Sequence, residues 1–285
     1  MDRALPIAVV VLMVVAAIAT TAWLTGDSGS DQLRIAEVVG GVTVTDAESH
    51  AVDVKAGLAL SAADRIVTGT DGRLVLQLGD DTMIRLAEDS TVQVASVSAD
   101  ELQLELEGGR ISATVRPTSA SVRVGSQGRQ VLAVDADFEA ARIGDNFAVE
   151  VDRGELGAQG IPGTNRIGQG ERLLLQGDAD PVMAPIPEDM MLEVEWPPKD
   201  FKTNKDVAVM AGRGEPGATI IVINDGKPKT TIVKPDGTWT IPIQLRDDIN
   251  VVDVNALGLF GGTADARGEI TADLGVKVGT PVVNP

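Results

Sequence analysis

The stretch from Val54 to Thr114 constrains the fold most, because apolar and polar residues alternate along it in short runs. A period of two turns one face of a strand towards a core and the other towards water. Residues that favour turns, such as Asp71-Gly72 and Gly108-Gly109, separate the runs. Strands that recur about every 8–12 residues predict an all-β unit. The apolar positions of the main runs are Leu74, Leu76 and Leu78; Ile84 and Leu86; Val92 and Val94; and Leu102, Leu104 and Leu106.

Short motifs follow one another in a fixed order through this region and beyond it. They are Val54-Lys55-Ala56-Gly57, Asp64-Arg65-Ile66, Asp71-Gly72-Arg73, Asp81-Thr82, Gly109-Arg110-Ile111, Phe147-Ala148-Val149, Gly154-Glu155 and Gly170-Glu171-Arg172. Together they resemble the FecR domain over residues 35–176. The resemblance implies an extracytoplasmic β-module, built as a solenoid or a sandwich, that serves in envelope signalling. Between Val131 and Phe138 the sequence departs from the family pattern, which usually carries Thr-Pro there.

The N-terminal segment contains an uncharged run, Ala4–Leu24, that is long enough to cross a membrane as one helix. Two interpretations remain open. Residues 1–26 form a signal-anchor, or Ala17-Ile18-Ala19 marks the cleavage site of a signal peptide. We favour the anchor, because secretory apolar segments are usually shorter, about 7–15 residues.

The charges that flank this run predict its orientation. Arg3 precedes it, whereas Asp27, Asp31 and Glu37 follow, which favours an N-terminus on the cytoplasmic side. We therefore expect a single-pass protein of the bacterial inner membrane, with the bulk of the chain in the periplasm. Members of the resembled family that regulate sigma factors carry a cytoplasmic domain before the span. With only Met1–Arg3 on that side, we expect signalling to need another membrane protein.

Proline density and lysine usage divide the rest of the chain. Five prolines fall between Gly177 and Pro198, which disfavours a helix or a central strand. We predict a FecR-like domain at 33–176, a linker at 177–198 and a second β-domain at 199–279. The motifs Glu215–Thr219 and Asp236–Trp239 resemble bacterial Ig-like domains, which implies a β-sandwich. Because Trp239 lies on a strand between Thr238 and Thr240, we expect it to be a core residue rather than a ligand platform.

Composition excludes several classes of function. The net charge of −18 disfavours nucleic acid as a partner. The chain has no Cys, and so neither a disulfide framework nor a zinc–thiolate site. Its aromatic content of 2% leaves few platforms for stacking sugars.

No motif in the sequence predicts catalysis or a cofactor. Gly212–Gly217 matches G-x-G-x-x-G, but Pro216 and the strand-like residues after it do not fit the helix that a dinucleotide site requires. His50, the only histidine, lies in a polar loop. Candidate oxygen ligands for Ca²⁺ are the pairs Asp80/Asp81, Asp135/Asp137 and Asp178/Asp180, although solvated turn residues at the surface are the default interpretation.

We therefore expect a non-enzymatic envelope protein that binds a protein partner or ligand, with the Ig-like half as a spacer or adhesive surface. The candidate partner surface comprises Arg73, Arg85, Asp80 and Asp81, because strand parity places both arginines on the outer face. Two alternatives remain: a structural scaffold of a larger envelope assembly, and a polysaccharide-acting protein.

Overall fold

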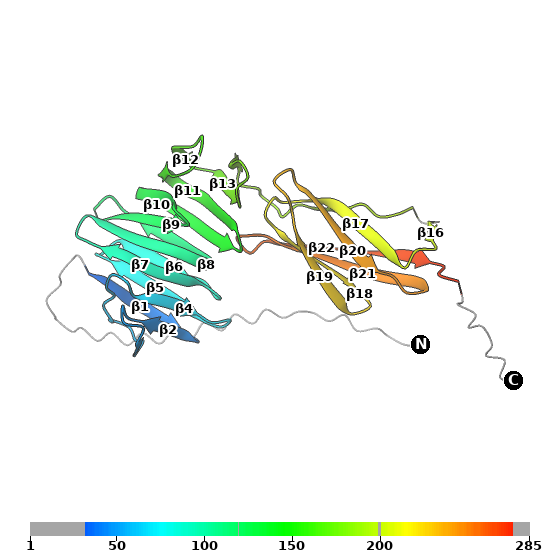
Figure 1. The fold of residues 1–285 in the computed structure, drawn as a ribbon. Helices are drawn as coiled ribbons and strands as arrows, with labels where there is room; N and C mark the ends of the chain where they lie inside the picture. The colour runs from blue at the N-terminus through cyan, green and yellow to red at the C-terminus, as the bar shows by residue number, and fades with distance from the viewer. Residues whose placement is uncertain (1–31, 119, 199–200, 276–285) are drawn as a thin grey trace, which may run out of the picture.

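The computed structural model describes residues 32–118, 120–198 and 201–275, and these residues form an all-β structure. One half contains a 14-stranded sheet, and the other contains a 3-stranded and a 5-stranded sheet. Figure 1 shows the two halves side by side, the first in blue to green and the second in yellow to red. The predicted all-β class is confirmed.

The predicted membrane helix at Ala4–Leu24 lies outside the described residues. Within the described ranges, no helix is long and apolar enough to cross a membrane.

The first half extends from Leu33 to Pro185. Its strands are β1 (Leu33–Val39), β2 (Val42–Thr45), β3 (Ala51–Val52), β4 (Arg65–Thr68), β5 (Arg73–Leu78), β6 (Thr82–Leu86), β7 (Thr91–Val97), β8 (Glu101–Val115), β9 (Ser121–Ser126), β10 (Arg129–Ile143), β11 (Asn146–Gln159), β12 (Arg166–Gly168), β13 (Glu171–Gln176) and β14 (Val182–Pro185).

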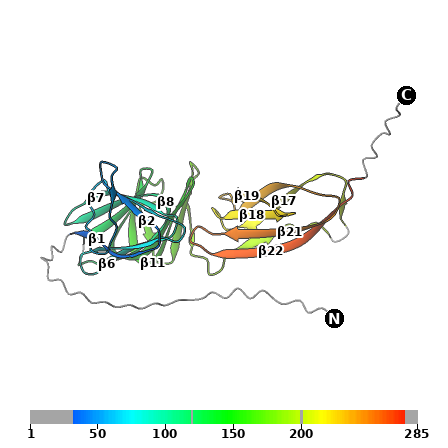
Figure 2. The same cartoon turned by 90° about the horizontal axis from the view of Figure 1, so that it is seen from below.

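Three long strands, β8, β10 and β11, fold this sheet over on itself. The first part of β8 pairs with β7 and β9, and its second part pairs with β6 and β10. One layer therefore has the order β14-β13-β11-β10-β8-β6-β5-β1, and the other has β12-β11-β10-β9-β8-β7-β4-β2-β3. In Figure 2, β2 and β7 of the second layer lie on one side of this half, and β1 and β6 of the first layer lie on the other. Every described pairing in this 14-stranded sheet is antiparallel except β8–β9, which does not support the solenoid alternative.

Glycines at the bends permit this folding. Gly109 has a φ of +84°, and a Cβ there would lie 2.4 Å from the Cα of Ser90. Gly154 has a φ of +81°, and its Cβ would lie 2.2 Å from the carbonyl oxygen of Asp135. Only glycine fits such positions without strain. The turn predicted at Gly108-Gly109 is therefore wrong: β8 stays one strand and bends there, because neighbours on both sides continue to pair with it.

The core of the first half lies between the two layers. The apolar residues that the alternation predicted to face inwards are buried, including Leu74, Leu76 and Ile84, each at most 1% exposed. Gln77 and Arg85 have the opposite parity and are partly or fully exposed. The predicted register of β5 and β6 is thus confirmed.

The second half builds a separate core between its two sheets. Its strands are β15 (Leu192–Val194), β16 (Lys202–Thr203), β17 (Val207–Gly214), β18 (Thr219–Asn224), β19 (Lys227–Ile232), β20 (Thr238–Gln244), β21 (Asp248–Leu257) and β22 (Thr263–Ala272).

Trp239 is 1% exposed in this core, as predicted, and its indole N–H donates to the carbonyl of Arg213 at 3.2 Å. A Cβ at Gly212 would lie 2.6 Å from the indole ring, so ring packing accounts for the first glycine of the G-x-G-x-x-G match.

The proline-rich segment contributes a strand to each half. β14 pairs with β13 in the first half, and β15 pairs with β17 in the second. Residues 186–191 run between these two strands. The domain boundaries at 176 and 199 stay a prediction.

Substitutions in β5 test the layer assignment. Leu76→Ala should lower the free energy of unfolding by about 2–5 kcal/mol, because it removes a fully buried side chain and leaves a cavity. Gln77→Ala should change it by no more than about 0.5 kcal/mol, because Gln77 has outward parity. Thermal or denaturant unfolding of both variants measures this difference. Equal destabilisation would show that the two faces of β5 are assigned incorrectly.

Candidate binding groove

The four residues of the predicted partner surface separate into two pairs. Arg73 begins β5 and Arg85 is near the end of β6, so both arginines lie at the same end of the β5–β6 hairpin. Asp80 and Asp81 occupy the turn at the other end of the hairpin. At the rise of an extended strand, Arg85 is about 14 Å from Asp81 and Arg73 is about 24 Å from Asp80. Asp81 accepts a hydrogen bond from the hydroxyl of Thr118 at 3.2 Å. The two aspartates therefore lie apart from the arginines along the hairpin, and their part in a partner surface stays a prediction.

Strand register aligns charged residues across the outer face of the first layer. Each position is paired with the next across neighbouring strands β1, β5, β6, β8 and β10, and all five side chains have outward parity. We call these residues the outer row: Glu37, Val75, Arg85, Ser112 and Glu139.

A groove of about 530 Å³ lies over the outer row. Its charged lining residues are Glu37, Arg73, Arg85, Glu88, Arg110 and Glu139, three of each sign. Phe260, from the second half of the chain, also lines the groove. The groove is therefore composite, because the loop that carries Phe260 connects β21 to β22.

That loop packs on an apolar patch beside the groove. Leu259 forms a small buried cluster with Ala141, Ala148 and Leu174 on the outer face of the first layer. Gly261 lies against Arg110, since a Cβ there would be 2.2 Å from Nη1 of that guanidinium. These contacts hold the tip of the β21–β22 hairpin on the sheet.

A buried cluster of ion pairs connects the two halves next to the β21–β22 loop. The Arg172 guanidinium on β13 pairs with Glu150 on β11 and with Glu215 in the β17–β18 loop. All three side chains are no more than 11% exposed. Arg172 also lies 5.4 Å from the centre of the Phe260 ring, within the range of a cation–π interaction. We call this cluster the Arg172 clasp.

A further hydrogen bond crosses the junction. The side-chain amide of Gln176 donates to the carbonyl of Val233 at 3.0 Å.

Ion pairs account for some of the charges in the groove. Oε2 of Glu88 lies 3.6 Å from Nε of Arg73, and Oε1 of Glu88 lies 3.5 Å from Nη2 of Arg110. A hydrogen bond from its own backbone N–H, with the charges of these two arginines, lowers the pKa of Glu88. Glu37, Arg85 and Glu139 form no ion pair with any described residue. Burial raises the pKa of Glu139, and the nearby charge of Asp152 adds to the effect.

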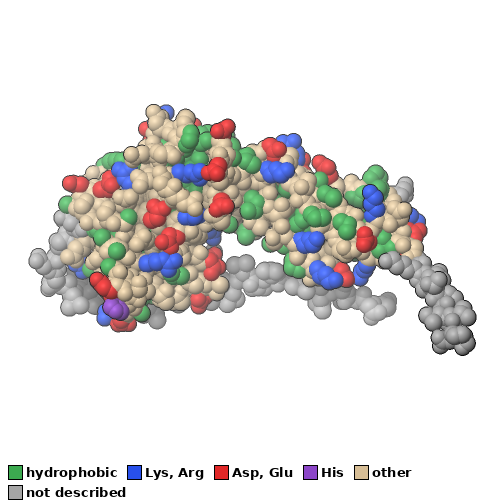
Figure 3. All heavy atoms as spheres, in the orientation of Figure 1, with side chains coloured by type: hydrophobic (Ala, Val, Ile, Leu, Met, Phe, Trp, Pro, Cys, Tyr) green, Lys and Arg blue, Asp and Glu red, His purple; other side chains and the backbone are tan. Residues whose placement is uncertain are grey.

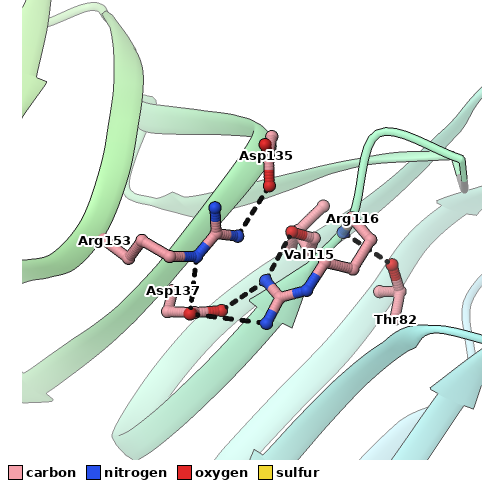
Figure 4. A network of polar contacts seen from close by, with 6 residues as sticks. All are labelled: Thr82, Val115, Arg116, Asp135, Asp137 and Arg153. Atoms are coloured by element: carbon pink, nitrogen blue, oxygen red, sulfur yellow. Dashed lines mark hydrogen bonds and ion pairs between the residues drawn. The ribbon is translucent and has the colours of Figure 1, made fainter.

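Asp135 and Asp137, one of the candidate Ca²⁺ pairs, are held by arginines instead (Figure 4). Arg153 donates to Asp135 at 2.6 Å and to Asp137 at 2.9 Å, and Arg116 donates to Asp137 at 2.6 Å. The hydrogen bond from Arg153 lowers the pKa of Asp135. The carboxylate oxygens of Asp135 and Asp137 already accept hydrogen bonds from the guanidinium groups of Arg116 and Arg153, so this pair does not fit a calcium site.

Asp178 and Asp180 are exposed on the turn after β13. The carboxylate and imidazole atoms of Asp46, Glu48 and His50 lie within 4.8 Å of one another on the β2–β3 turn. Asp46 accepts the backbone N–H of Glu48 at 3.1 Å and of His50 at 2.8 Å, so turn formation explains this group. On the face shown in Figure 3, acidic and basic side chains are interspersed over both halves.

Sequence reasoning identified Arg73 and Arg85 but missed Arg110, Glu139 and Phe260. Arg110 and Glu139 reach the groove through the pairing of β8 with β6 and β10, and Phe260 reaches it through the docking of the second half. The parity of β8 and β10 was available in the sequence, but the order of the strands was not.

The raised pKa of Glu139 makes a prediction about pH. The pKa of Glu139 is higher in the folded protein than in the unfolded chain, so ionisation of its carboxyl near neutral pH lowers the free energy of unfolding. At a pH below the unfolded pKa the carboxyl is protonated in both states, and this destabilisation is absent. Glu139→Gln should therefore raise the melting temperature at about pH 7, and the variant and wild type should converge near about pH 4. Glu155→Gln, which removes an exposed carboxylate, is the matched control and should have little effect. A lower melting temperature for Glu139→Gln at neutral pH would contradict the burial described here.

Comparison with known proteins relates the part of the chain that forms most of the groove to a known family. The FecR protein family matches residues 64–156. No curated protein matches the sequence. A candidate anti-sigma factor from Parabacteroides distasonis is 17% identical with a TM-score of 0.38, over 42% of this chain and 59% of that protein. The present chain thus spans less than two thirds of the length of that structure.

Two bacterial ice-binding adhesins align over more of the chain. One, of 1.5 MDa, is 12% identical over 86% of this chain and 88% of that structure, with a TM-score of 0.23. The other, a Ca²⁺-stabilised adhesin of an Antarctic bacterium, is 11% identical over 85% and 91%, with a TM-score of 0.24. These structural scores are too low to support an argument about function. The family match shows that the chain contains a FecR domain at residues 64–156, which supplies most of the groove.

Proposed function

We propose that this chain is a non-enzymatic, membrane-anchored protein of the bacterial envelope whose FecR domain binds a protein partner through the groove. The run Ala4–Leu24 is the anchor, and the rest of the chain lies on the extracytoplasmic side of the inner membrane. Binding at this surface contributes to envelope signalling, in keeping with the family match.

The position of the groove within the matched segment carries the proposal. Arg73, Arg85, Arg110 and Glu139 all lie in residues 64–156, and all come from paired strands or their ends. A sheet holds such side chains at fixed spacings, which suits recognition of a partner. Charged residues on a rigid face contribute to specificity and to the rate of association.

The lining of the groove favours binding over catalysis. Among its described residues, Ser112 is the only hydroxyl, and no His or Cys lies near it to act as a base or a nucleophile. His50 is on the β2–β3 turn, with its side chain 76% exposed.

The tryptophans do not favour a polysaccharide ligand either. Trp239 is buried, and the Trp196 ring lies against Gly268, where an added Cβ would be 2.5 Å from the ring. Trp239 therefore offers no free face for stacking a sugar, and Gly268 covers one face of the Trp196 ring.

The second half supports the groove. We assign it as an Ig-like sandwich, supported by its two sheets around the Trp239 core. It acts as a spacer next to the FecR domain, and it supplies Phe260 as one wall of the groove.

The alternative of a scaffold that assembles through strand edges has less support. The edge strand β19 carries exposed Lys227 and Lys229, and lysines on an edge disfavour pairing with another sheet.

Site-specific photo-crosslinking in native membranes tests the proposal. A photoreactive residue at Arg85 should capture a discrete protein species, and the same residue at Arg166, exposed on β12, should not. Arg73→Glu should reduce capture from position 85, because it reverses a charge in the groove. Equal capture from both positions, or none from position 85, would contradict a partner surface here.

A further inference from the structure

Three charges of the groove form no ion pair among the described residues, namely Glu37, Arg85 and Glu139. Val75 separates Glu37 from Arg85, whereas a polar residue separates Arg85 from Glu139. Arg85 and Glu139 both pair in register with Ser112, which lies between them on β8. Arg73 and Arg110, in contrast, share the carboxylate of Glu88. The groove therefore presents one free guanidinium and two free carboxylates, and Arg85 and Glu139 are the pair that flanks a serine.

The spacing of this pair sets the size of a matching ligand. Two interstrand steps separate the backbones of β6 and β10, which corresponds to about 9.6 Å. An extended tripeptide has a similar length, about 10 Å, between its two ends. Its charged termini can thus reach Arg85 and Glu139 at the same time.

We propose that the groove binds a short zwitterionic peptide segment, with its carboxylate at Arg85 and its ammonium group at Glu139. This inference rests on the proposed function, because it assigns a ligand chemistry to the same surface. The Ser112 hydroxyl lies beneath the peptide and can donate to it or accept from it. Phe260 and Val39 provide apolar walls for its side chains.

The balance of charge favours a zwitterion over an ion of one sign. The lining has three acidic and three basic residues, so a purely anionic or purely cationic ligand would meet as many repulsive as attractive groups. A polyanion would also be repelled by a chain of net charge −18. A ligand with both charges satisfies the guanidinium and the carboxylate together, each by a charge-assisted hydrogen bond.

Calorimetric titration of the full-length protein with trialanine tests this. We expect saturable binding that weakens about tenfold or more when the peptide is N-acetylated or C-amidated, because each change removes one charge. In Arg85→Gln, C-amidation of the peptide should no longer weaken binding, whereas N-acetylation still should. In Glu139→Gln, N-acetylation should no longer weaken binding, whereas C-amidation still should. Arg166→Gln and Glu155→Gln, an exposed pair that does not line the groove, are matched controls and should bind as wild type.

Each contrary outcome overturns the assignment. They are no binding at about 10 mM trialanine, equal binding of the capped peptides, and equal effects of control and groove variants. If crosslinking from position 85 still captures a protein when trialanine fails, the partner surface stands and the zwitterionic ligand is wrong. If both experiments fail, the groove is not a binding site.

Discussion

One buried guanidinium, that of Arg172, connects the two halves of this protein. It neutralises Glu150 of the first half and Glu215 of the second, and it lies over the Phe260 ring. Burying three charges is costly in water-excluded surroundings, and close pairing offsets that cost. Without Arg172, two buried carboxylates would face each other unpaired. The placement of Phe260, and with it the shape of the groove, therefore depends on this residue.

The remainder of the groove depends on the folding of one sheet. β8 and β10 bend and continue into both layers. The second part of β8 therefore pairs with β6 on one side and with β10 on the other. That pairing brings Arg85, Ser112 and Glu139 into one row, although they are far apart in the sequence. Glycines at the bends, such as Gly109 and Gly154, make room for this path. The row is a consequence of strand order and register, and the clasp then adds one wall from the second half.

Local sequence patterns predicted the parts of this arrangement that depend on one strand or one hairpin. The alternation of Leu74, Leu76 and Leu78 identified the buried face, and with it the outward parity of Arg73 and Arg85. Parity says nothing about position along a strand, so it does not separate Asp80 and Asp81 from the arginines. Glu139 and Phe260 could not be found, since their places depend on pairing between distant strands and on docking of the halves. Gly108-Gly109 reads as a turn in sequence but serves as a bend within a strand.

The Arg172 clasp holds the two halves in one arrangement and so completes the groove. The chain has no native cysteine, so spin labels at Asp145→Cys and Asp265→Cys, both exposed, report the distance between the halves by pulsed electron paramagnetic resonance. We expect one narrow distance distribution for the otherwise unaltered protein and for the control Arg166→Met. Arg172→Met, which removes the charge and keeps an apolar stem, should give a broader distribution that extends to longer distances. A distribution for Arg172→Met as narrow as that of the control would contradict this account.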